Sequence, residues 1–325
     1  MSSGPFQKTG AVVRFHHPGP PSVLVLEDED VPLPGPGEVR FRARAIGVNF
    51  VDTAFRDGSF NSPLPATGGV EAAGVIDAVG PGVTDHAVGD RVGYFFAPGS
   101  YAELRNVPAE VLIRLPDDIA FDDAAAIMTK GLTAWVAIRH LHPVEPGEAV
   151  LVQGATGGVG SLTARWADAL GAHVVGTGSA AKLGVLTGSG VRGVDSHDPN
   201  LADQLRRLVP GGFDVVCEFV GWATFPASVA AMRDGGEIVM IGAASGRPEV
   251  DRDTLASRRI RLSSGSTAQL VRGSLLASAS AEVFDAHRRG VFGTLRLSRY
   301  PLADAVRAHE DIASRNRDGL LLLIP

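Results

Sequence analysis

A glycine-rich turn at residues 154–160 carries the clearest chemical signal in the sequence. The letters GATGGVG follow the apolar run AVLVQ and precede a segment, about 158–170, whose pattern predicts a helix. Such a turn brings backbone amides and a helix N-terminus to a pyrophosphate, although a merely structural glycine turn is the alternative. Alanine replaces the first glycine of the fingerprint at position 155. The residues predicted to contact a dinucleotide here are Ala155, Thr156, Gly157, Gly158, Val159 and Gly160.

The end of the next apolar run, AHVVGT, indicates which dinucleotide is bound. Thr177 is the last residue of this run, Gly178, Ser179 and Lys182 follow it, and residues 169–194 contain no Asp or Glu. An acidic side chain there would accept hydrogen bonds from the 2′-hydroxyl of NAD and would repel the 2′-phosphate of NADP. Ser179 can donate a hydrogen bond to that phosphate and Lys182 can supply positive charge, so we predict NADPH. The alternative for Lys182 is an ordinary solvated residue on a helix.

Apolar strands alternate with helical segments around this turn. Strands are expected at about 149–154, 173–177, 191–195, 213–220, 237–242 and 259–263. This alternation predicts a doubly wound parallel sheet, in which ligands lie beyond the carboxyl ends of the strands. Gly221, Gly242 and Ala243 are therefore expected to border the cofactor, with Arg315 near the C-terminus as a further candidate.

The segments on either side of this sheet have a different pattern. Residues 11–125 contain short apolar runs separated by Gly and Pro, which predicts a compact β-rich domain, and 122–141 reads as a helix. A helix near 270–289, a strand near 294–298, a helix near 302–314 and the strand LLLLI complete the chain. We expect a discontinuous β-rich domain, 1–126 and 267–325, interrupted by a dinucleotide-binding domain, 127–266.

Composition excludes several classes of protein. The formal net charge of −6 and the scattered arginines give no basic surface for nucleic acid. Cys217, the single cysteine, lies in the apolar run FDVVCEFV, where a buried core residue is expected rather than a catalytic thiol. We find neither an apolar segment of signal-peptide length at the N-terminus nor a run approaching the roughly 20 apolar residues that span a bilayer. A cytoplasmic protein is expected.

Five motifs, in order along nearly the whole chain, resemble the medium-chain dehydrogenase/reductase superfamily and, within it, the zinc-independent quinone oxidoreductases. They are GVNFVDTAFRDG, GGVEAAGVIDAVGPGVTDHAVGDRVGYF, MTKGLTAW, GATGGVG and AVRAHEDIASRNRDGLLLLIP. The resemblance implies an α/β protein with a Rossmann doubly wound parallel sheet plus a β-rich GroES-like catalytic domain. It also implies a homodimer.

The resemblance bears on metal binding as well. Zinc-dependent relatives in the superfamily hold a catalytic metal with Cys, His and a further Cys or acidic ligand, and the corresponding positions here are Asn49, Val70 and Lys130. Zinc prefers thiolate, imidazole or carboxylate ligands, so no metal site is expected.

A reaction without metal transfers hydride from the nicotinamide directly to an acceptor that takes charge onto oxygen. By resemblance, Asn49 lies beside the cofactor at the catalytic cleft. Asp52, three residues further on, is expected to orient its neighbours or cap a helix rather than act as a base. Lys130 and Thr133, expected at the opening of a helix near the domain junction, are placed against the nicotinamide or the substrate. Pairing of Lys130 with a carboxylate such as Glu71 is the alternative.

Aromatic residues of the expected pocket depart from the family pattern. Ala54 and Phe60 stand where such enzymes often carry Tyr, and Ser196 stands near where a Tyr flanks the adenosine phosphate. Phe60, Phe95 and Phe96 are predicted to line an apolar substrate pocket, with core packing as the alternative.

The substrate expected from the resemblance is a quinone. An enone, enal or enoyl group is the alternative substrate for the same scaffold. A non-catalytic NADPH-binding protein with structural or regulatory duties is the alternative outside enzymes.

Overall fold

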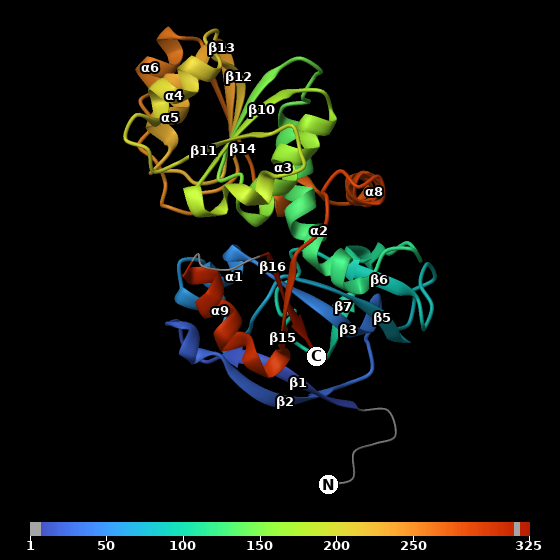
Figure 1. Ribbon diagram of the computed structural model, residues 1–325. Helices are drawn as coiled ribbons and strands as arrows, with labels where there is room; N and C mark the ends of the chain where they lie inside the picture. The colour runs from blue at the N-terminus through green and yellow to red at the C-terminus, as the bar shows by residue number, and fades with distance from the viewer. Residues whose placement is uncertain (1–7, 315–318) are drawn as a thin grey trace. The chain divides into compact units, whose positions relative to one another are not determined.

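The computed structural model describes residues 8–314 and 319–325 (Figure 1). These residues form two compact units. Unit 1 comprises the described residues of 1–129, 272–280 and 295–325, and unit 2 comprises 130–271 and 281–294. The domain boundaries inferred from the sequence stay a prediction.

Unit 2 is built on a six-stranded sheet in which every neighbouring pair of strands is parallel. The strands are β9 (Ala149–Gln153), β10 (His173–Gly178), β11 (Arg192–Asp195), β12 (Phe213–Glu218), β13 (Met232–Met240) and β14 (Arg261–Ser264). Their order is β11-β10-β9-β12-β13-β14, which confirms the predicted doubly wound sheet. The winding direction reverses beside β9, the place in such sheets where ligands bind beyond the strand ends.

Helices cover both faces of this sheet. They are α3 (Gly158–Ala169), α4 (Leu201–Leu208), α5 (Phe225–Ala231) and α6 (Arg252–Ser257), with a 3₁₀ helix η4 (Ala180–Leu186) and a π-helix η3 (Val136–Leu141). Figure 1 shows α4, α5 and α6 gathered on one face and α3 on the other. Leu205, Phe225 and Leu255 of the first group pack into one core with Leu151 and Val216 of the sheet, so burial of apolar faces holds the layers together.

Unit 1 is rich in β-structure, as predicted. Its larger sheet has the order β15-β16-β3-β5-β6-β8, with β7 also paired to β3. These strands are β3 (Glu38–Val48), β5 (Glu71–Val79), β6 (Arg91–Tyr94), β7 (Leu104–Pro108), β8 (Ile113–Arg114), β15 (Leu297–Pro301) and β16 (Leu320–Ile324). A smaller sheet joins β1 (Lys8–Phe15), β2 (Val25–Val31) and β4 (Ala66–Thr67).

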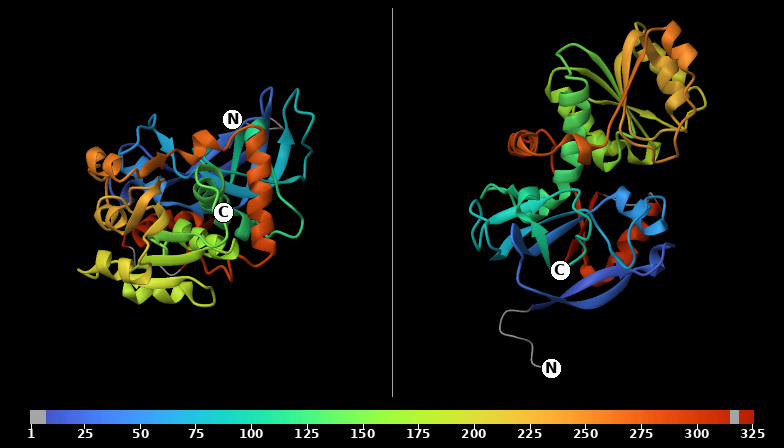
Figure 2. Two further views of the ribbon diagram at one scale, coloured as in Figure 1. Left: turned by 90° about the horizontal axis from the view of Figure 1, so that it is seen from above. Right: turned by 180° about the vertical axis from the view of Figure 1, so that it is seen from behind.

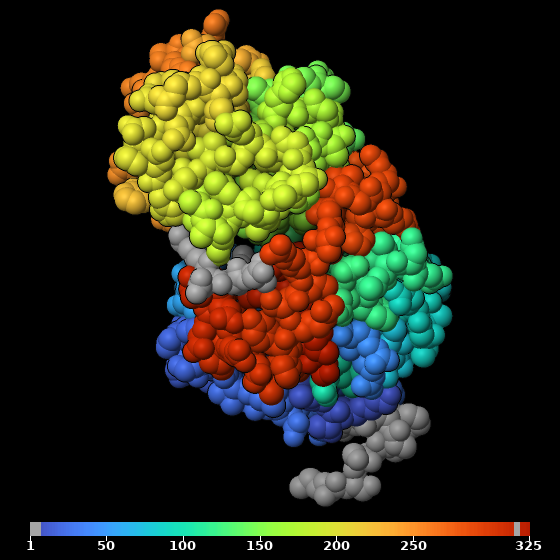
Figure 3. All heavy atoms as spheres, in the orientation of Figure 1, coloured from blue at the N-terminus to red at the C-terminus, as the bar shows by residue number. Residues whose placement is uncertain are grey.

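Two helices pack beside these sheets, α1 (Phe50–Asp57) and α9 (Ala305–Ala313). They contact each other, although they are far apart in the sequence (Figure 2). The outer side of α9 forms part of the surface of unit 1 (Figure 3), while Ala305, Ala308, His309 and Ile312 face inward. Short 3₁₀ helices complete the unit: η1 (Pro21–Val23), η2 (Ala109–Val111) and η5 (Leu302–Asp304).

Three expected elements differ from the structure. The helix expected at 270–289 is divided into α7 (Thr267–Leu270) and α8 (Ser274–Arg288), because Gly273 has a φ of 55°, which an α-helix does not allow. The strand expected at 237–242 begins at Met232, where the pairing with β12 contains a register shift. The helix expected at 122–141 is α2 (Phe121–Trp135) followed directly by η3.

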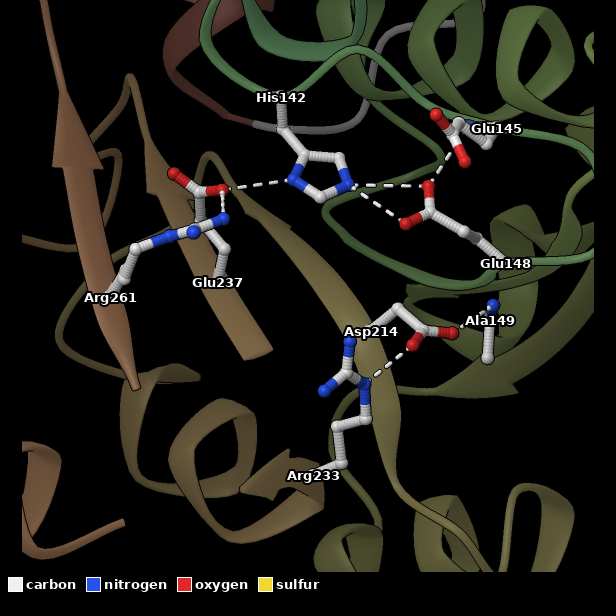
Figure 4. Close-up of polar contacts among 8 residues, drawn as sticks. All are labelled: His142, Glu145, Glu148, Ala149, Asp214, Arg233, Glu237 and Arg261. Atoms are coloured by element: carbon white, nitrogen blue, oxygen red, sulfur yellow. Dashed lines mark hydrogen bonds and ion pairs between the residues drawn. The ribbon is translucent and has the colours of Figure 1, made fainter. Parts of the chain in front are cut away.

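Hydrogen bonds and ion pairs connect side chains at the amino-terminal edge of the sheet in unit 2 (Figure 4). His142 Nδ1 lies 2.9 Å from Glu237 Oε2, and His142 Nε2 lies 3.2 Å from Glu148 Oε2. Arg261 also binds Glu237, at 2.7 Å. The Asp214 carboxylate accepts the Ala149 N–H and an N–H of Arg233. Among the described residues, no helix is both long and apolar enough to cross a bilayer.

Candidate functional site

The glycine-rich turn between β9 and α3 leaves no room for larger side chains. A Cβ at Gly160 would lie 2.2 Å from the carbonyl oxygen of Gly154, so only glycine allows the helix to pack this closely on the turn. The Gly157 N–H donates to the Gly154 oxygen at 2.9 Å and closes the turn. Gly157 also precedes the first residue of α3, whose N-terminus carries the partial positive charge that attracts anions.

The neighbouring strand β10 provides the space that Ala155 and Thr156 occupy. A Cβ at Gly176 would lie 2.6 Å from the Ala155 Cβ, and a Cβ at Gly178 would lie 2.3 Å from the Thr156 Oγ1. Alanine therefore fits the first fingerprint position because the strand opposite has glycine. The Ala155 N–H donates to the Thr177 carbonyl oxygen at 2.7 Å and ties the turn to β10.

The end of β10 holds the residues expected beside the 2′-phosphate. Ser179 and Lys182 are both partly buried at the start of η4, and the Lys182 N–H donates to the Ser179 oxygen at 2.8 Å. The sequence analysis missed Asp195, which ends β11 and pairs in register with Gly178. A hydrogen bond from the His197 N–H is the largest cause that lowers the pKa of Asp195. Parallel pairing of strands, not spacing in the sequence, brings this carboxylate to the site.

Two further turns follow β12 and β13. Gly221 has a φ of 91°, and a Cβ there would lie 2.3 Å from the Gly246 oxygen and 3.1 Å from the Ala243 Cα. A Cβ at Gly242 would lie 2.6 Å from the Phe219 oxygen. Close backbone approach thus requires both glycines, and the structure brings Gly221 and Ala243 together.

A line of side chains buried in the sheet runs beneath these turns: Thr177, Gln153, Ser228 and Glu218, here called the polar spine. The Thr177 hydroxyl donates to Gln153 Oε1, and Gln153 Nε2 donates to Ser228 Oγ at 3.0 Å. The Ser228 hydroxyl donates to Glu218 Oε2 at 2.7 Å. All four residues have an exposed fraction of 0%. The sequence offered one signal of the polar spine that was missed, the acidic residue in the apolar run FDVVCEFV.

Donors surround the Glu218 carboxylate. Its Oε1 accepts the Val220 N–H, the Gly221 N–H and the Thr224 hydroxyl, in addition to the Ser228 hydroxyl on Oε2. Burial raises the pKa of Glu218 above its usual value, and these hydrogen bonds oppose that rise. Because every partner donates, the arrangement suits the carboxylate anion.

In unit 1, Asn49 lies between β3 and α1 and is 5% exposed. Its Nδ2 donates to Glu71 Oε1 at 2.8 Å, while Glu71 Oε2 accepts the Thr129 N–H at 2.7 Å. The Asn49 N–H donates to Asp52 Oδ2 at 2.8 Å, one half of a capping box at the start of α1. Asp52 therefore acts on the backbone that carries Asn49.

Three buried residues connect Asp52 to α9. The Tyr101 hydroxyl donates to Asp52 Oδ2 at 3.0 Å and lies 2.8 Å from His309 Nε2. Arg56 Nη1 lies 3.0 Å from His309 Nδ1. Burial, with the Arg56 charge, lowers the pKa of His309 to about 3, and burial with the Asp52 charge raises the pKa of Tyr101 well above its usual value. A neutral His309 that accepts at Nδ1 donates from Nε2 to Tyr101.

Lys130 and Thr133 lie in the second half of α2, not at the opening of a helix as expected. The helix begins at Phe121, with Asp122 and Asp123 in its first turn, so the Ala-rich segment before Lys130 is already helical. Both residues are buried, and the Thr133 and Thr267 hydroxyl oxygens are 3.2 Å apart. Whether Lys130 pairs with Glu71 stays a prediction.

The three phenylalanines predicted to line a pocket have different surroundings. Phe60 is 47% exposed and makes an edge contact with Phe55, with ring centres 5.5 Å apart. Phe95 is buried and contacts Phe96, whose φ is 53°. The substrate pocket they were expected to form stays a prediction.

The remaining candidates concern metal and thiol chemistry. Among the described residues, no group of three or more His, Cys, Asp or Glu is placed to hold a metal ion. Cys217 is buried, and burial raises the pKa of its thiol to about 12, which matches the expected core residue. Arg315 lies outside the described residues.

Known proteins resemble this chain over nearly its full length. Residues 35–117 match the alcohol dehydrogenase GroES-like domain family, and residues 158–282 match the zinc-binding dehydrogenase family. A quinone oxidoreductase from Pseudomonas aeruginosa is 37% identical, over 96% of this chain and 99% of that protein. A 2-haloacrylate reductase from a Burkholderia species is 36% identical, over 95% of this chain and 97% of that protein.

A crystal structure of Escherichia coli quinone oxidoreductase complexed with NADPH has a TM-score of 0.92 and 34% identity, covering 97% of this chain and 100% of that one. The two units have the architecture that the five sequence motifs implied. The chain belongs to the quinone oxidoreductase family of the medium-chain dehydrogenase/reductase superfamily.

Proposed function

We propose that this protein is an NADPH-dependent quinone oxidoreductase. The observation that carries the proposal is the turn after β9, where the missing side chain at Gly160 lets the first turn of α3 pack closely on the backbone of Gly154. Relatives named quinone oxidoreductase, 35% to 37% identical over 96% of the chain, support the choice of reaction.

The residues of unit 2 fit a phosphorylated dinucleotide. We propose that amides of the turn and of the first residues of α3 bind the pyrophosphate, while Gly221, Gly242 and Ala243 border the rest of the cofactor. Ser179 and Lys182 would bind the 2′-phosphate through a hydroxyl and a positive charge. Asp195 opposes this phosphate electrostatically, so Lys182 has to offset a nearby carboxylate.

The residues of unit 1 would act on the acceptor. When bound, NADPH supplies a hydride, and the acceptor oxygen gains negative charge. We propose that the Asn49 amide donates a hydrogen bond to that oxygen, and that Glu71 and Asp52 orient Asn49 for this task. Lys130 and Thr133 are proposed to contact the nicotinamide or the acceptor, and Phe60, Phe95 and Phe96 to line the apolar pocket.

Several properties belong to the same proposal. The reaction is zinc-independent, because Asn49, Val70 and Lys130 offer an amide, an alkyl group and an ammonium where zinc requires other ligands. The protein is a cytoplasmic homodimer that binds neither membranes nor nucleic acid. Elemental analysis of the purified protein tests whether it contains zinc, and light scattering tests whether it is a dimer.

The activity is tested by following NADPH absorbance with 1,2- and 1,4-quinones, then with enals and enoyl thioesters. We expect oxidation of NADPH with a quinone and a much slower reaction with NADH. Tight binding of NADPH without oxidation by any acceptor would instead indicate a non-catalytic NADPH-binding protein.

A second candidate is reduction of an activated alkene. The resemblance to 2-haloacrylate reductase favours it, because that relative is nearly as similar as the quinone oxidoreductases. Turnover of 2-haloacrylate or an enal without turnover of any quinone would establish this alternative.

A further inference from the structure

We propose that Ser228, Gln153 and Glu218 are positioning residues for the cofactor. Through the polar spine they hold the turn after β9 and the turn after β12 at a fixed separation, and this separation sets the affinity for NADPH. The inference rests on the proposed function, because it assumes that both turns bind NADPH.

The first end of the polar spine holds the glycine-rich turn. The Thr177 hydroxyl oxygen accepts the Gly154 N–H at 3.4 Å, and the Thr177 carbonyl oxygen accepts the Ala155 N–H at 2.7 Å. Two successive amides of the turn are therefore attached to one residue of β10. The Thr177 hydroxyl then donates onward to Gln153, which ends β9.

The other end holds the turn after β12. Glu218 Oε1 accepts the Val220 and Gly221 N–H groups, both at 2.9 Å. The same oxygen accepts the Thr224 hydroxyl at 2.8 Å, which attaches the segment entering α5. Gly221 has a positive φ, so this turn holds a backbone conformation that few residues adopt, and the carboxylate supplies the partner that keeps it there.

Ser228 closes the connection between the two ends. It lies in α5, accepts from Gln153 Nε2 at 3.0 Å and donates to Glu218 Oε2 at 2.7 Å. The Ser228 hydroxyl carries one hydrogen and also lies 3.2 Å from the Thr224 carbonyl oxygen, but Glu218 Oε2 is the nearer acceptor. A shift of either turn would break a hydrogen bond of groups with an exposed fraction of 0%, where no water can replace it.

None of these three residues was predicted to touch the cofactor. Ser228 and Gln153 lie beneath the turns, and neutral donors rather than a cation surround Glu218 in the contacts described above. Their effect on NADPH therefore has to pass through the backbone of the two turns. This separates the proposal from the phosphate contacts assigned to Ser179 and Lys182.

The experiment compares NADPH dissociation constants and melting temperatures of folded variants. Ser228→Ala cuts the polar spine at its centre, and Thr177→Val cuts it at the glycine-rich turn. Thr163→Val is the matched control, because Thr163 is equally buried in unit 2 but donates only within α3, to the Val159 oxygen. Thr177→Ser keeps the hydroxyl and should bind NADPH like the parent.

We expect Ser228→Ala to weaken NADPH binding on the order of tenfold, with KM for NADPH raised and kcat at saturation little changed. The double variant Ser228→Ala/Thr177→Val should bind about as weakly as the weaker single variant, because both cuts break one connection. Thr163→Val should lower the melting temperature without changing the affinity.

Unchanged affinity in a folded Ser228→Ala variant would overturn the proposal, as would additive losses in the double variant. If Ser228→Ala does not fold, Thr177→Val compared with Thr177→Ser makes the same test. Amide hydrogen exchange measured without cofactor tests the polar spine separately from the proposed NADPH-dependent function. Faster exchange at both Gly154 and Gly221 in Ser228→Ala supports the connection even if the parent fails to bind NADPH, whereas unchanged exchange refutes it.

Discussion

The two edges of the sheet in unit 2 use buried and half-buried carboxylates in opposite ways. At the amino-terminal edge, Glu237 and Glu148 lie within hydrogen-bond distance of His142, and the Arg261 guanidinium also binds Glu237 (Figure 4). At the carboxyl-terminal edge, Glu218 is fully buried and its described hydrogen bonds come from backbone amides and hydroxyls. The first edge relies mainly on contacts between side chains, with a single backbone N–H on each of Asp214 and Glu148, and the second surrounds one carboxylate with backbone amides and hydroxyls.

This difference matters because contacts between side chains and contacts to backbone amides restrict different parts of the structure. An ion pair joins side chains and responds to salt and pH, while the backbone it connects keeps some freedom. A carboxylate that accepts backbone amides fixes the backbone itself. The amino-terminal edge should therefore affect stability, and the carboxyl-terminal edge should affect ligand binding as well.

The largest expected contrast comes from adding one methyl group at each edge. Gly160→Ala places a Cβ 2.2 Å from the backbone oxygen of Gly154, so we expect a loss of about 3 kcal/mol in stability and no measurable NADPH binding. Gly211→Ala, just before β12, meets no atom within 4 Å and should change neither quantity appreciably. Calorimetric titration and thermal melts check both, and normal binding by Gly160→Ala would contradict the site.

The next largest difference between the two edges is expected when a positively charged side chain is removed from each. Lys182→Ala at the carboxyl-terminal edge should weaken NADPH binding about tenfold and leave NADH affinity nearly unchanged, since one charge-assisted contact is lost. Arg233→Ala removes the ion pair with Asp214 at the other edge and should leave both affinities as they are. Equal losses for NADPH and NADH in Lys182→Ala would refute its role at the 2′-phosphate.

The pH dependence of stability should have opposite signs for the two glutamates. Burial works against ionisation of Glu237, but hydrogen bonds from Ser263, His142 and Arg261 outweigh it and lower its pKa below 4.5, so its contribution is present above pH 4.5 and lost as the pH falls through the folded pKa. Burial raises the pKa of Glu218, so its ionisation removes stability as the pH rises from 4.5 through the folded pKa.

Unfolding free energies of Glu237→Gln and Glu218→Gln against pH check these signs. Relative to the parent, Glu237→Gln should lose less stability on acidification. Glu218→Gln should lose less as the pH rises above 4.5. Parallel curves for the two variants would show that the edges do not differ in the way described.

The smallest expected effect concerns the carboxylate beside the 2′-phosphate. Asp195→Asn removes a negative charge next to the end of β10, and we expect NADPH to bind about two- to threefold more tightly because this exposed charge is screened by solvent. NADH affinity should stay the same. Weaker NADPH binding would mean that Asp195 supports the site by another route.

Local patterns in the sequence were sufficient to predict much of the fold of this protein. Alternation of apolar strands and helical segments predicted the six parallel strands, because each strand must bury both faces. Gly160 was predicted to contact the cofactor from the glycine-rich turn, and Gly221 from its place after a strand. The structure shows that close backbone approach requires glycine at both positions, and their contact with the cofactor stays a prediction. The helix at 270–289 was wrong at Gly273, where a single conformation interrupts an otherwise helical pattern.

Tertiary structure alone decided which polar groups meet. Thr177, Gln153, Ser228 and Glu218 come from three strands and a helix, and their hydrogen bonds depend on strand order and register, which no local spacing encodes. The same holds for Asp195 beside Gly178 and for His309, which joins Tyr101 from the other end of the chain. Short-range steric limits and apolar periodicity depend on neighbouring residues and can be recognised in the sequence. Hydrogen bonds between polar side chains that are distant in the sequence form only when the chain packs into its tertiary structure.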